Sequence, residues 1–88
     1  MKINWKKLKP ATLLLVTWDD IVDDASWLSD EKFQSMQPVI CKSIGWFINH
    51  DKLNIRIAHS VTFDGDKSGT VIPKGVIRNV RVIKYKIK

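Results

Sequence analysis

The amino-acid sequence predicts a mainly β protein, a small and strongly bent five-stranded antiparallel barrel with one short helical insert. Three observations support this fold class. The chain has 88 residues, which is the length of one small domain. Its apolar residues alternate with polar ones over several short segments, and clusters of turn-forming residues separate these segments. We therefore expect a single domain over residues 1–88, with a basic arm at residues 1–10 and an acidic insert at residues 19–38.

The first strand is expected at residues 11–18, which are rich in Leu, Val and Thr. The acidic insert that follows is polar, and Ser29 can cap a short helix within it. Phe33 and Met36 would share one face of that helix, and Pro38 would end it.

From Val39 onwards the apolar pattern has a period of two, which is typical of strands. The second strand ends at a polar turn over residues 49–51, and Gly45 in its middle permits a sharp bend. The residues expected on one side of this strand are Ile40, Ile44, Trp46 and Ile48. Those expected on one side of the third strand are Leu53, Ile55, Ile57, Val61 and Phe63.

Residues 64–69 form a loop by composition, and two further strands follow it. Between these strands, Pro73 removes a ladder N–H and Gly75 permits a bend, so that Lys74 lies on a tight corner. The last strand is expected at residues 83–88, where apolar residues alternate with lysine.

Cys41 is the only cysteine, which excludes a disulfide within one chain and a metal site built on cysteines. A lone cysteine among apolar residues indicates a small core residue and a reducing compartment. Because so short a chain has a large surface for its volume, oligomerisation is the expected source of additional stability.

The net charge of +6 is unevenly distributed. Six of the nine acidic residues lie between Asp19 and Glu31, and the remainder of the chain is strongly basic. A basic body attracts polyanions, among which nucleic acid is the commonest, and unlike patches favour self-association. Solubility alone is the alternative explanation of this charge.

Lysines of the basic arm precede an apolar run at residues 11–16, as in the start of a signal peptide. Trp18, Asp19 and Asp20 close this run early, no small-residue cleavage site follows, and the run is too short to span a membrane. We expect a cytoplasmic protein without membrane contact.

The aspartates at residues 19–24 match the aspartate-rich pattern that holds magnesium diphosphate in prenyl synthases. The chain is too short for the large helical cavity of those enzymes, and a solvated or intersubunit acidic loop is the favoured interpretation. His59, on an apolar strand face, is expected in the core with a hydrogen bond, and His50 is expected to be exposed in a turn. Neither has a triad-like context, so we expect no catalytic residues, no metal ion and no cofactor.

The four tryptophans are Trp5, Trp18, Trp27 and Trp46. Trp18 and Trp46 are consistent with core packing. Trp27, in the polar insert, is the best candidate for an interface or a base-stacking surface.

The segment at residues 45–57 resembles the first Sm motif. In that motif glycine, a hydrophobe and aspartate stand at fixed spacing before an apolar residue and asparagine. Gly45, Phe47 and Asp51 have this spacing, whereas Leu53 and Asn54 come one residue early.

Residues 72–77 resemble the second Sm motif, in which a hydrophobe precedes arginine-glycine and a hydrophobic strand. Here Lys74 replaces the arginine, and Pro73 is inserted. Together with residues 17–27, which are not part of the Sm pattern, this segment is similar to small Sm-like (LSm) proteins of marine phages.

The resemblance implies a bent sheet whose edge strands pair between protomers, forming a homo-oligomeric ring of about five to seven copies. It also implies binding of single-stranded RNA, in which the asparagine and the arginine-glycine corner hold one base per protomer. The corresponding residues are His50, Lys52, Asn54, Lys74 and Gly75. Because lysine lacks the planar bidentate contact of arginine, weaker or altered base recognition is expected.

The sequence therefore predicts a non-catalytic, homo-oligomeric Sm-like ring that binds single-stranded RNA, in the cytoplasm of the host cell if the protein is phage-encoded. The alternative is a small β-barrel that acts as a structural or protein-binding module without nucleic acid. A metal-dependent enzyme based on the aspartates is a distant third.

Overall fold

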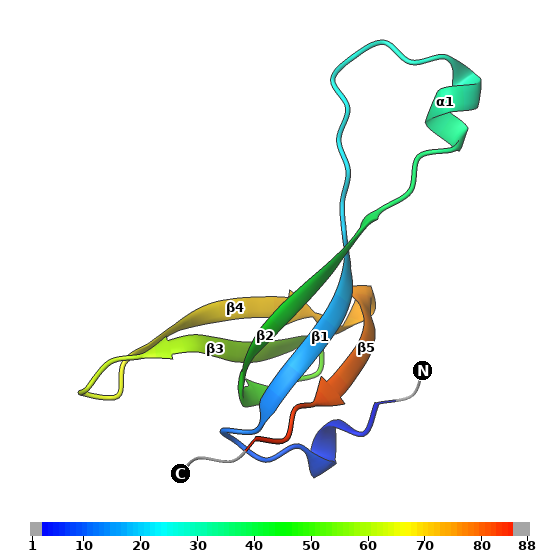
Figure 1. Ribbon diagram of the computed structural model, residues 1–88. Coiled ribbons are helices and arrows are strands. Elements are labelled where there is room, and N and C mark those ends of the chain that lie inside the picture. Colours follow the sequence, from blue (N-terminus) through cyan, green and yellow to red (C-terminus); the bar gives the residue numbers. More distant parts are fainter. Residues whose placement is uncertain (1–2, 86–88) are drawn as a thin grey trace.

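A computed structural model describes residues 3–85 of the chain (Figure 1). It consists of one antiparallel sheet, one short helix and two 3₁₀ turns. The elements are, in chain order, η1 (Trp5–Lys7), β1 (Leu13–Asp20), α1 (Asp30–Gln34), β2 (Val39–His50), β3 (Asn54–Val61), β4 (Lys67–Pro73), η2 (Lys74–Val76) and β5 (Ile77–Val82).

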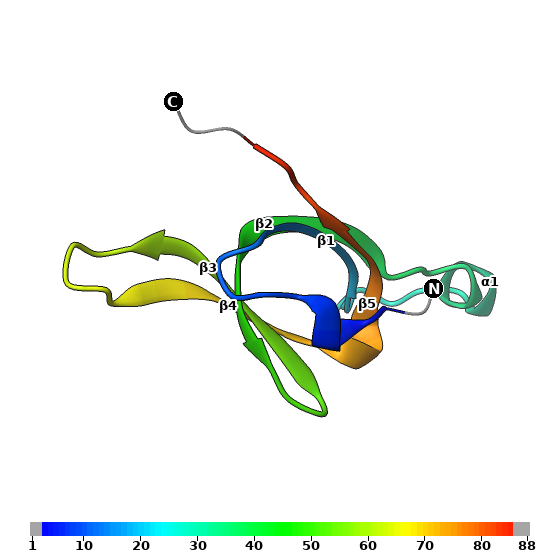
Figure 2. The same cartoon turned by 90° about the horizontal axis from the view of Figure 1, so that it is seen from below.

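The five strands form a single sheet in the order β4-β3-β2-β1-β5, so the predicted mainly β class and strand number are confirmed. The prediction of a closed barrel is wrong, because within residues 3–85 β4 pairs with β3 alone and β5 pairs with β1 alone. The sheet curls strongly around β1, β2 and β5, while the β3–β4 hairpin runs outward from it (Figure 2). β4 and β5 would have to pair to close a barrel. They instead diverge at η2 and remain the two edges of the sheet.

The core lies on the concave face of this curl. Leu14 and Val16 of β1 face Ile55 and Ile57 of β3, and all four are almost completely buried. Phe47 and Ile72 complete this core cluster. Ala58 is also buried, but it lies opposite Trp46 on the outer face. Trp5, Leu8 and Trp18 pack against its edge, as expected for Trp18, whose indole Nε1 donates a hydrogen bond to Ser43 Oγ at 3.0 Å.

The apolar side of β2 faces away from this core. Gly45 and Phe47 point inward, whereas Ile40 and Ile44 are more than half exposed. The expectation that Trp46 is a core residue is wrong, because it lies on the outer face, half-buried. Phe47 fills the inner side because the opposing strands offer it an apolar layer, and Gly45 beside it admits the close approach of β3.

The alternation expected for β3 holds only in its first half. Ile55 and Ile57 are buried, but Leu53, Val61 and Phe63 are exposed. A register shift between Ala58 and Ser60, as in a β-bulge, moves the later side chains off the core. For the same reason His59 is exposed, which corrects its predicted core position. Its ring nitrogens nevertheless lie 2.7 Å from Ile44 O and 2.8 Å from Thr70 Oγ1.

The acidic insert projects away from the sheet between β1 and β2 (Figure 1). Its helix is confirmed: Ser29 Oγ accepts a hydrogen bond from the Lys32 N–H at 3.3 Å and caps α1. The helix ends at Gln34, before Pro38. The Ser35 N–H donates to Glu31 O at 3.3 Å and the Met36 N–H to Phe33 O at 3.1 Å, and these bonds close the last turn. No residue of α1 reaches the core cluster of the described chain.

At the ends of the chain, one short turn forms and one predicted strand does not. The basic arm contains the turn η1, and residues 1–2 lie outside the described part. The last strand is β5, which ends at Val82, so a strand over 83–85 is not formed, and residues 86–88 lie outside the described part. Across residues 3–85 there is no helix long and apolar enough to cross a membrane.

Candidate nucleic-acid interface

The corner between β4 and β5 is tied to the turn between β2 and β3. Asn54 pairs with Pro73 in the β3–β4 ladder, and the Lys74 N–H donates to Leu53 O at 2.7 Å. Lys74 and Gly75 then continue into η2. The fold thus brings the residues of the two Sm-like segments to one end of the sheet, although they lie about twenty positions apart in the sequence.

The Lys74 side chain points back into this end of the sheet. Its Nζ lies 2.9 Å from His50 Nδ1 and 4.9 Å from the centroid of the Trp5 ring. Because an ammonium can only donate, His50 Nδ1 accepts and the ring proton lies on Nε2. The Trp5 and His50 rings stack with centroids 6.2 Å apart and an interplanar angle of 27°. The corner site, defined as Trp5, His50, Asn54, Lys74 and Gly75, therefore combines a cation with stacked aromatic rings.

Asp51 fixes the turn that carries Asn54. Its Oδ1 accepts hydrogen bonds from the Leu53 N–H at 2.9 Å and the Asn54 N–H at 2.8 Å. Its Oδ2 pairs with Arg56 Nη2 at 2.7 Å. The Arg56 hydrogen bond first, and then the two backbone N–H groups, lower the pKa of Asp51 from its ordinary value of 3.8 to about 2. The turn therefore holds an ionised carboxylate over the whole neutral and mildly acidic range.

The predicted site residues differ in their exposure and in their contacts. His50 is half-buried and stacked rather than exposed, which corrects its predicted position. Asn54 and Lys74 are half-buried at the corner. Lys52 is exposed on the turn, and within residues 3–85 no side-chain hydrogen bond or ion pair joins it to the corner site.

Gly75 is exposed, and a Cβ added to it would meet nothing within 4 Å. Among the glycines of the described chain only Gly65 has a positive φ, so the η2 backbone does not require glycine at position 75. The folding of a single chain therefore gives no reason for this glycine, in contrast to Gly45.

Sequence reasoning missed two contributors to this site. Trp5 lies in the basic arm, 45 positions before His50, and only the tertiary fold brings the rings together. Arg56 holds Asp51 and also donates from Nη1 to Asn49 Oδ1 at 3.1 Å. The one available signal was the aromatic residue among the lysines of the basic arm, a composition that is common where nucleic acid binds.

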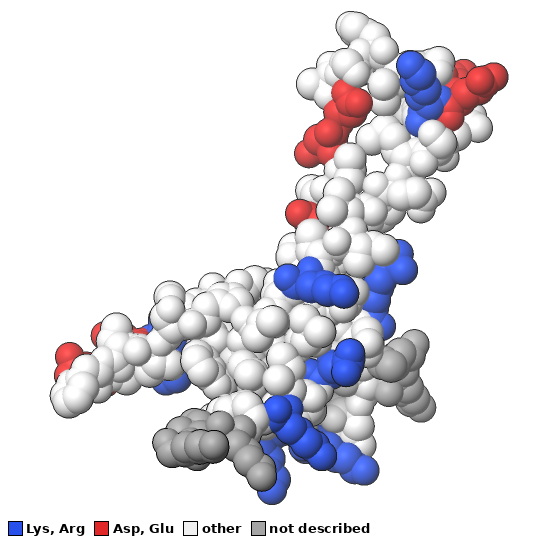
Figure 3. Space-filling view, in the orientation of Figure 1, with Lys and Arg blue, Asp and Glu red and all other residues white. Residues whose placement is uncertain are grey.

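The charges are segregated as the sequence predicts. Basic side chains cover the body around the sheet, and acidic ones gather on the projecting insert and at the tip of the β3–β4 hairpin (Figure 3). Within residues 3–85, no cluster of three or more His, Cys, Asp or Glu residues could hold a metal ion. The chemistry available at the corner site is therefore stacking, hydrogen bonding by an amide and attraction of an anion.

Comparisons with protein-family models, with curated proteins and with solved structures find no match to this chain.

Proposed function

We propose that the protein is a non-catalytic, homo-oligomeric Sm-like protein that binds single-stranded RNA at the corner site, in the cytoplasm of a host cell if it is phage-encoded. The observation that carries the proposal is the contact of Lys74 with both His50 and Trp5 beside Asn54. These residues come from four separate segments, and each type suits an unpaired nucleotide.

Each group has a distinct role in this proposal. An unpaired base stacks on the exposed side of the Trp5–His50 pair, where aromatic stacking contributes about 1–3 kcal/mol per base. The Asn54 amide donates to and accepts from the edge of the base. Lys74 attracts a phosphate or a base carbonyl as a point charge, and the open surface at Gly75 allows the chain of the RNA to approach the backbone.

The free edges of the sheet support the assembly part of the proposal. β4 and β5 each pair on one side only, so each presents unused backbone N–H and C=O groups. Pairing β4 of one copy with β5 of the next would satisfy these groups and repeat the corner site around a ring. A repeated lysine concentrates positive charge, which makes polyanion binding strong and dependent on salt.

The test is a titration of short homopolymer RNAs with three variants. Lys74→Ala should weaken binding roughly tenfold or more and reduce its salt dependence, because every protomer loses one phosphate contact. Lys74→Arg should retain or strengthen binding, since guanidinium adds a planar contact. Lys84→Ala removes the same charge from an exposed position after β5 and should have little effect. Equal small losses from the two alanine variants would indicate attraction by net charge alone.

A second candidate function rests on a different observation. Ile21, Trp27 and Phe33 of the acidic insert are 82%, 102% and 68% exposed, which is unusual for large apolar side chains. Such a surface suits a structural or protein-binding module. Absence of RNA binding by the unmodified protein at low salt would favour this function over the first.

A further inference from the structure

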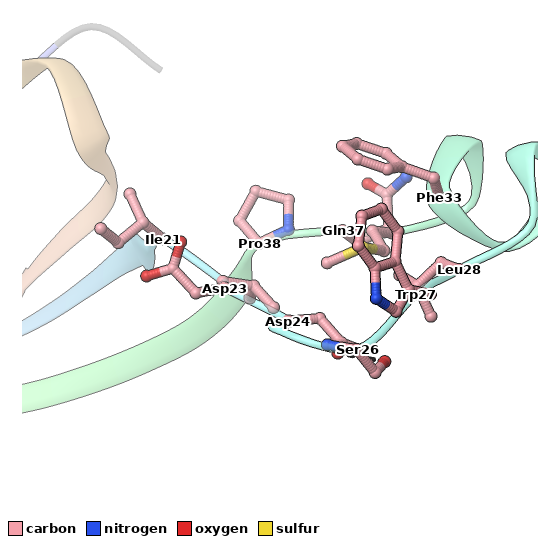
Figure 4. Close-up of a pocket in the computed structure, with 11 residues that line it drawn as sticks. Ile21, Asp23, Asp24, Ser26, Trp27, Leu28, Phe33, Gln37 and Pro38 are labelled. Carbon is pink, nitrogen blue, oxygen red and sulfur yellow. Dashed lines mark hydrogen bonds between the residues drawn. The ribbon is translucent and has the colours of Figure 1, made fainter.

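Large apolar side chains of the acidic insert are exposed and lie away from the core of their own chain. Trp27 and Phe33 lie at the far end of the insert beside α1, and Ile21 and Pro38 lie at its base near the sheet (Figure 4). Asp23 and Asp24 line the same hollow as these side chains. The hydrogen bonds from Ser26 lower the pKa of Asp24, which keeps it ionised. The insert therefore combines exposed apolar side chains with carboxylates.

The outer face of the sheet carries an apolar surface that has a basic side chain in place of the carboxylates. A shallow groove of about 590 Å³ crosses β2 and β3 there, and its lining is apolar apart from one lysine at the rim. We call it the outer groove; its lining residues include Ala11, Trp46, Ile48, Ala58, Val61 and Lys67. Within one chain the insert extends away from the sheet in a different direction from the β3–β4 hairpin that carries Lys67 (Figure 1).

We propose that the acidic insert of one copy docks in the outer groove of a second copy, with Trp27 as the anchor. Three features favour a second copy as the occupant. The insert carries six acidic residues, whereas the rest of the chain carries fourteen of the fifteen basic ones. Unlike charges steer the two surfaces together, and Lys67, whose Nζ donates to Gly65 O at 3.0 Å, lines the groove within reach of an incoming carboxylate. A tryptophan buries roughly 150–250 Å² on docking, which makes it the natural centre of such a contact.

This contact differs from the pairing of β4 with β5 and does not depend on RNA. It uses the outer face and the insert, so it can join copies within a ring or between rings. It also explains why a half-buried Trp46 and an exposed Trp27 occur in a chain whose own core uses neither.

Carbodiimide cross-linking, which joins a carboxylate to a lysine amine, tests the proposal in the absence of RNA. An equal mixture of ¹⁵N-labelled and unlabelled protein should give peptides in which Asp23 or Asp24 of one copy is joined to Lys67 of the other. Trp27→Ser should reduce these intermolecular products by roughly 30-fold, as expected for a central tryptophan. Leu53→Ser is the matched control, since Leu53 is 68% exposed but lies outside both surfaces, and it should leave the products unchanged.

A complementation experiment decides between this contact and any other. Val61→Glu places a charge in the groove at a side chain that is 52% exposed, so the fold should tolerate it. Trp27→Ser and Val61→Glu should each cross-link only weakly alone, but a mixture should regain the product that joins the insert of the Val61→Glu protein to Lys67 of the Trp27→Ser protein. Absence of the product in the mixture, or intermolecular products that Trp27→Ser leaves unchanged, would overturn the proposal. Its failure would leave the RNA titration unaffected, because the corner site is separate.

Discussion

Gly45 lies in the middle of β2, where β3 passes at close range. A Cβ added there would stand 2.8 Å from Ala58 O and 3.1 Å from Ile57 Cβ, which is closer than real Cβ atoms come to backbone oxygens. β2 and β3 would have to separate to admit a methyl group. The resemblance to the first Sm motif at this position thus has a packing reason within a single chain.

Gly45→Ala should therefore cost about 1–3 kcal/mol of unfolding free energy, the usual range for overpacking. Gly75→Ala is the matched change and should stay within about 0.5 kcal/mol, because its added Cβ meets nothing. Thermal unfolding of the two variants measures the difference. If Gly75→Ala keeps the stability of the parent but weakens RNA binding, the glycine serves the approach of a ligand; a large loss of stability would contradict the open surface at η2.

For residues of the core, the expected loss of stability on truncation follows from their burial. Ile55 of β3 is fully buried in the core cluster, so Ile55→Ala should cost about 2–5 kcal/mol. Leu53→Ala, two positions earlier and largely exposed, should cost much less. Denaturant unfolding of the two variants checks this, and equal losses would mean that β3 does not face the core as described.

At the scale of the element, the turn between β2 and β3 depends on one ionised carboxylate. The pKa of Asp51 is lowered to about 2, so the folded state favours the charged form. Its contribution is complete above the ordinary value of 3.8 and is lost as the pH falls from there through about 2. The pH dependence of folding should therefore steepen in that window.

Asp51→Asn should flatten the pH dependence of the melting temperature in the same window, because an amide cannot titrate. It keeps an oxygen that can accept from the Leu53 and Asn54 N–H groups, whereas Asp51→Ala loses both the ion pair and the turn hydrogen bonds. At neutral pH the melting temperature should therefore be highest for the parent, lower for Asp51→Asn and lowest for Asp51→Ala. An asparagine variant with the parent's pH profile would show that other carboxylates determine it.

The elements also show how far the sequence predicts the fold. The number of strands, the short helix and the Pro73–Gly75 corner follow from local propensity, and the structure confirms them. The last strand, β5, however lies at Ile77–Val82 and not at the predicted residues 83–88. The inward face of β2 was not predictable, because counting apolar residues favours the side of Ile44 and Trp46. The core instead selects Phe47, through residues on other strands that no local pattern includes.

The corner site, too, could be predicted only in part, because a local pattern does not reveal contacts between distant segments. Asn54 and Lys74 come from segments whose resemblance to a known pattern could be recognised, and the β3–β4 register brings them together. Trp5 joins them only because the basic arm crosses β2, where the Ala11 N–H donates to Phe47 O and the Phe47 N–H donates to Thr12 O. Such backbone pairing across 35 positions leaves no periodic trace in the sequence.

At the scale of the whole molecule, the two open edges of the sheet leave backbone groups that another copy of the chain could pair. Every second backbone N–H of β4 points away from β3, and every second one of β5 points away from β1, so neither set has a partner in the sheet of one chain. A bent sheet that closed on itself would have paired these groups internally, as the sequence predicts. Because it stays open, these groups are available for the pairing between copies that we propose.

If the copies form a ring, these outward N–H groups should exchange with solvent slowly, as the inward ones do. Hydrogen exchange measured residue by residue in β4 and β5 should then show protection without the alternation typical of an edge strand. The loop amide of Asp64, an exposed residue, provides the rapidly exchanging reference. Light scattering on the same sample should give about five to seven copies. A monomer at micromolar concentration, with alternate amides of both strands exchanging as fast as the loop, would exclude edge pairing at that concentration.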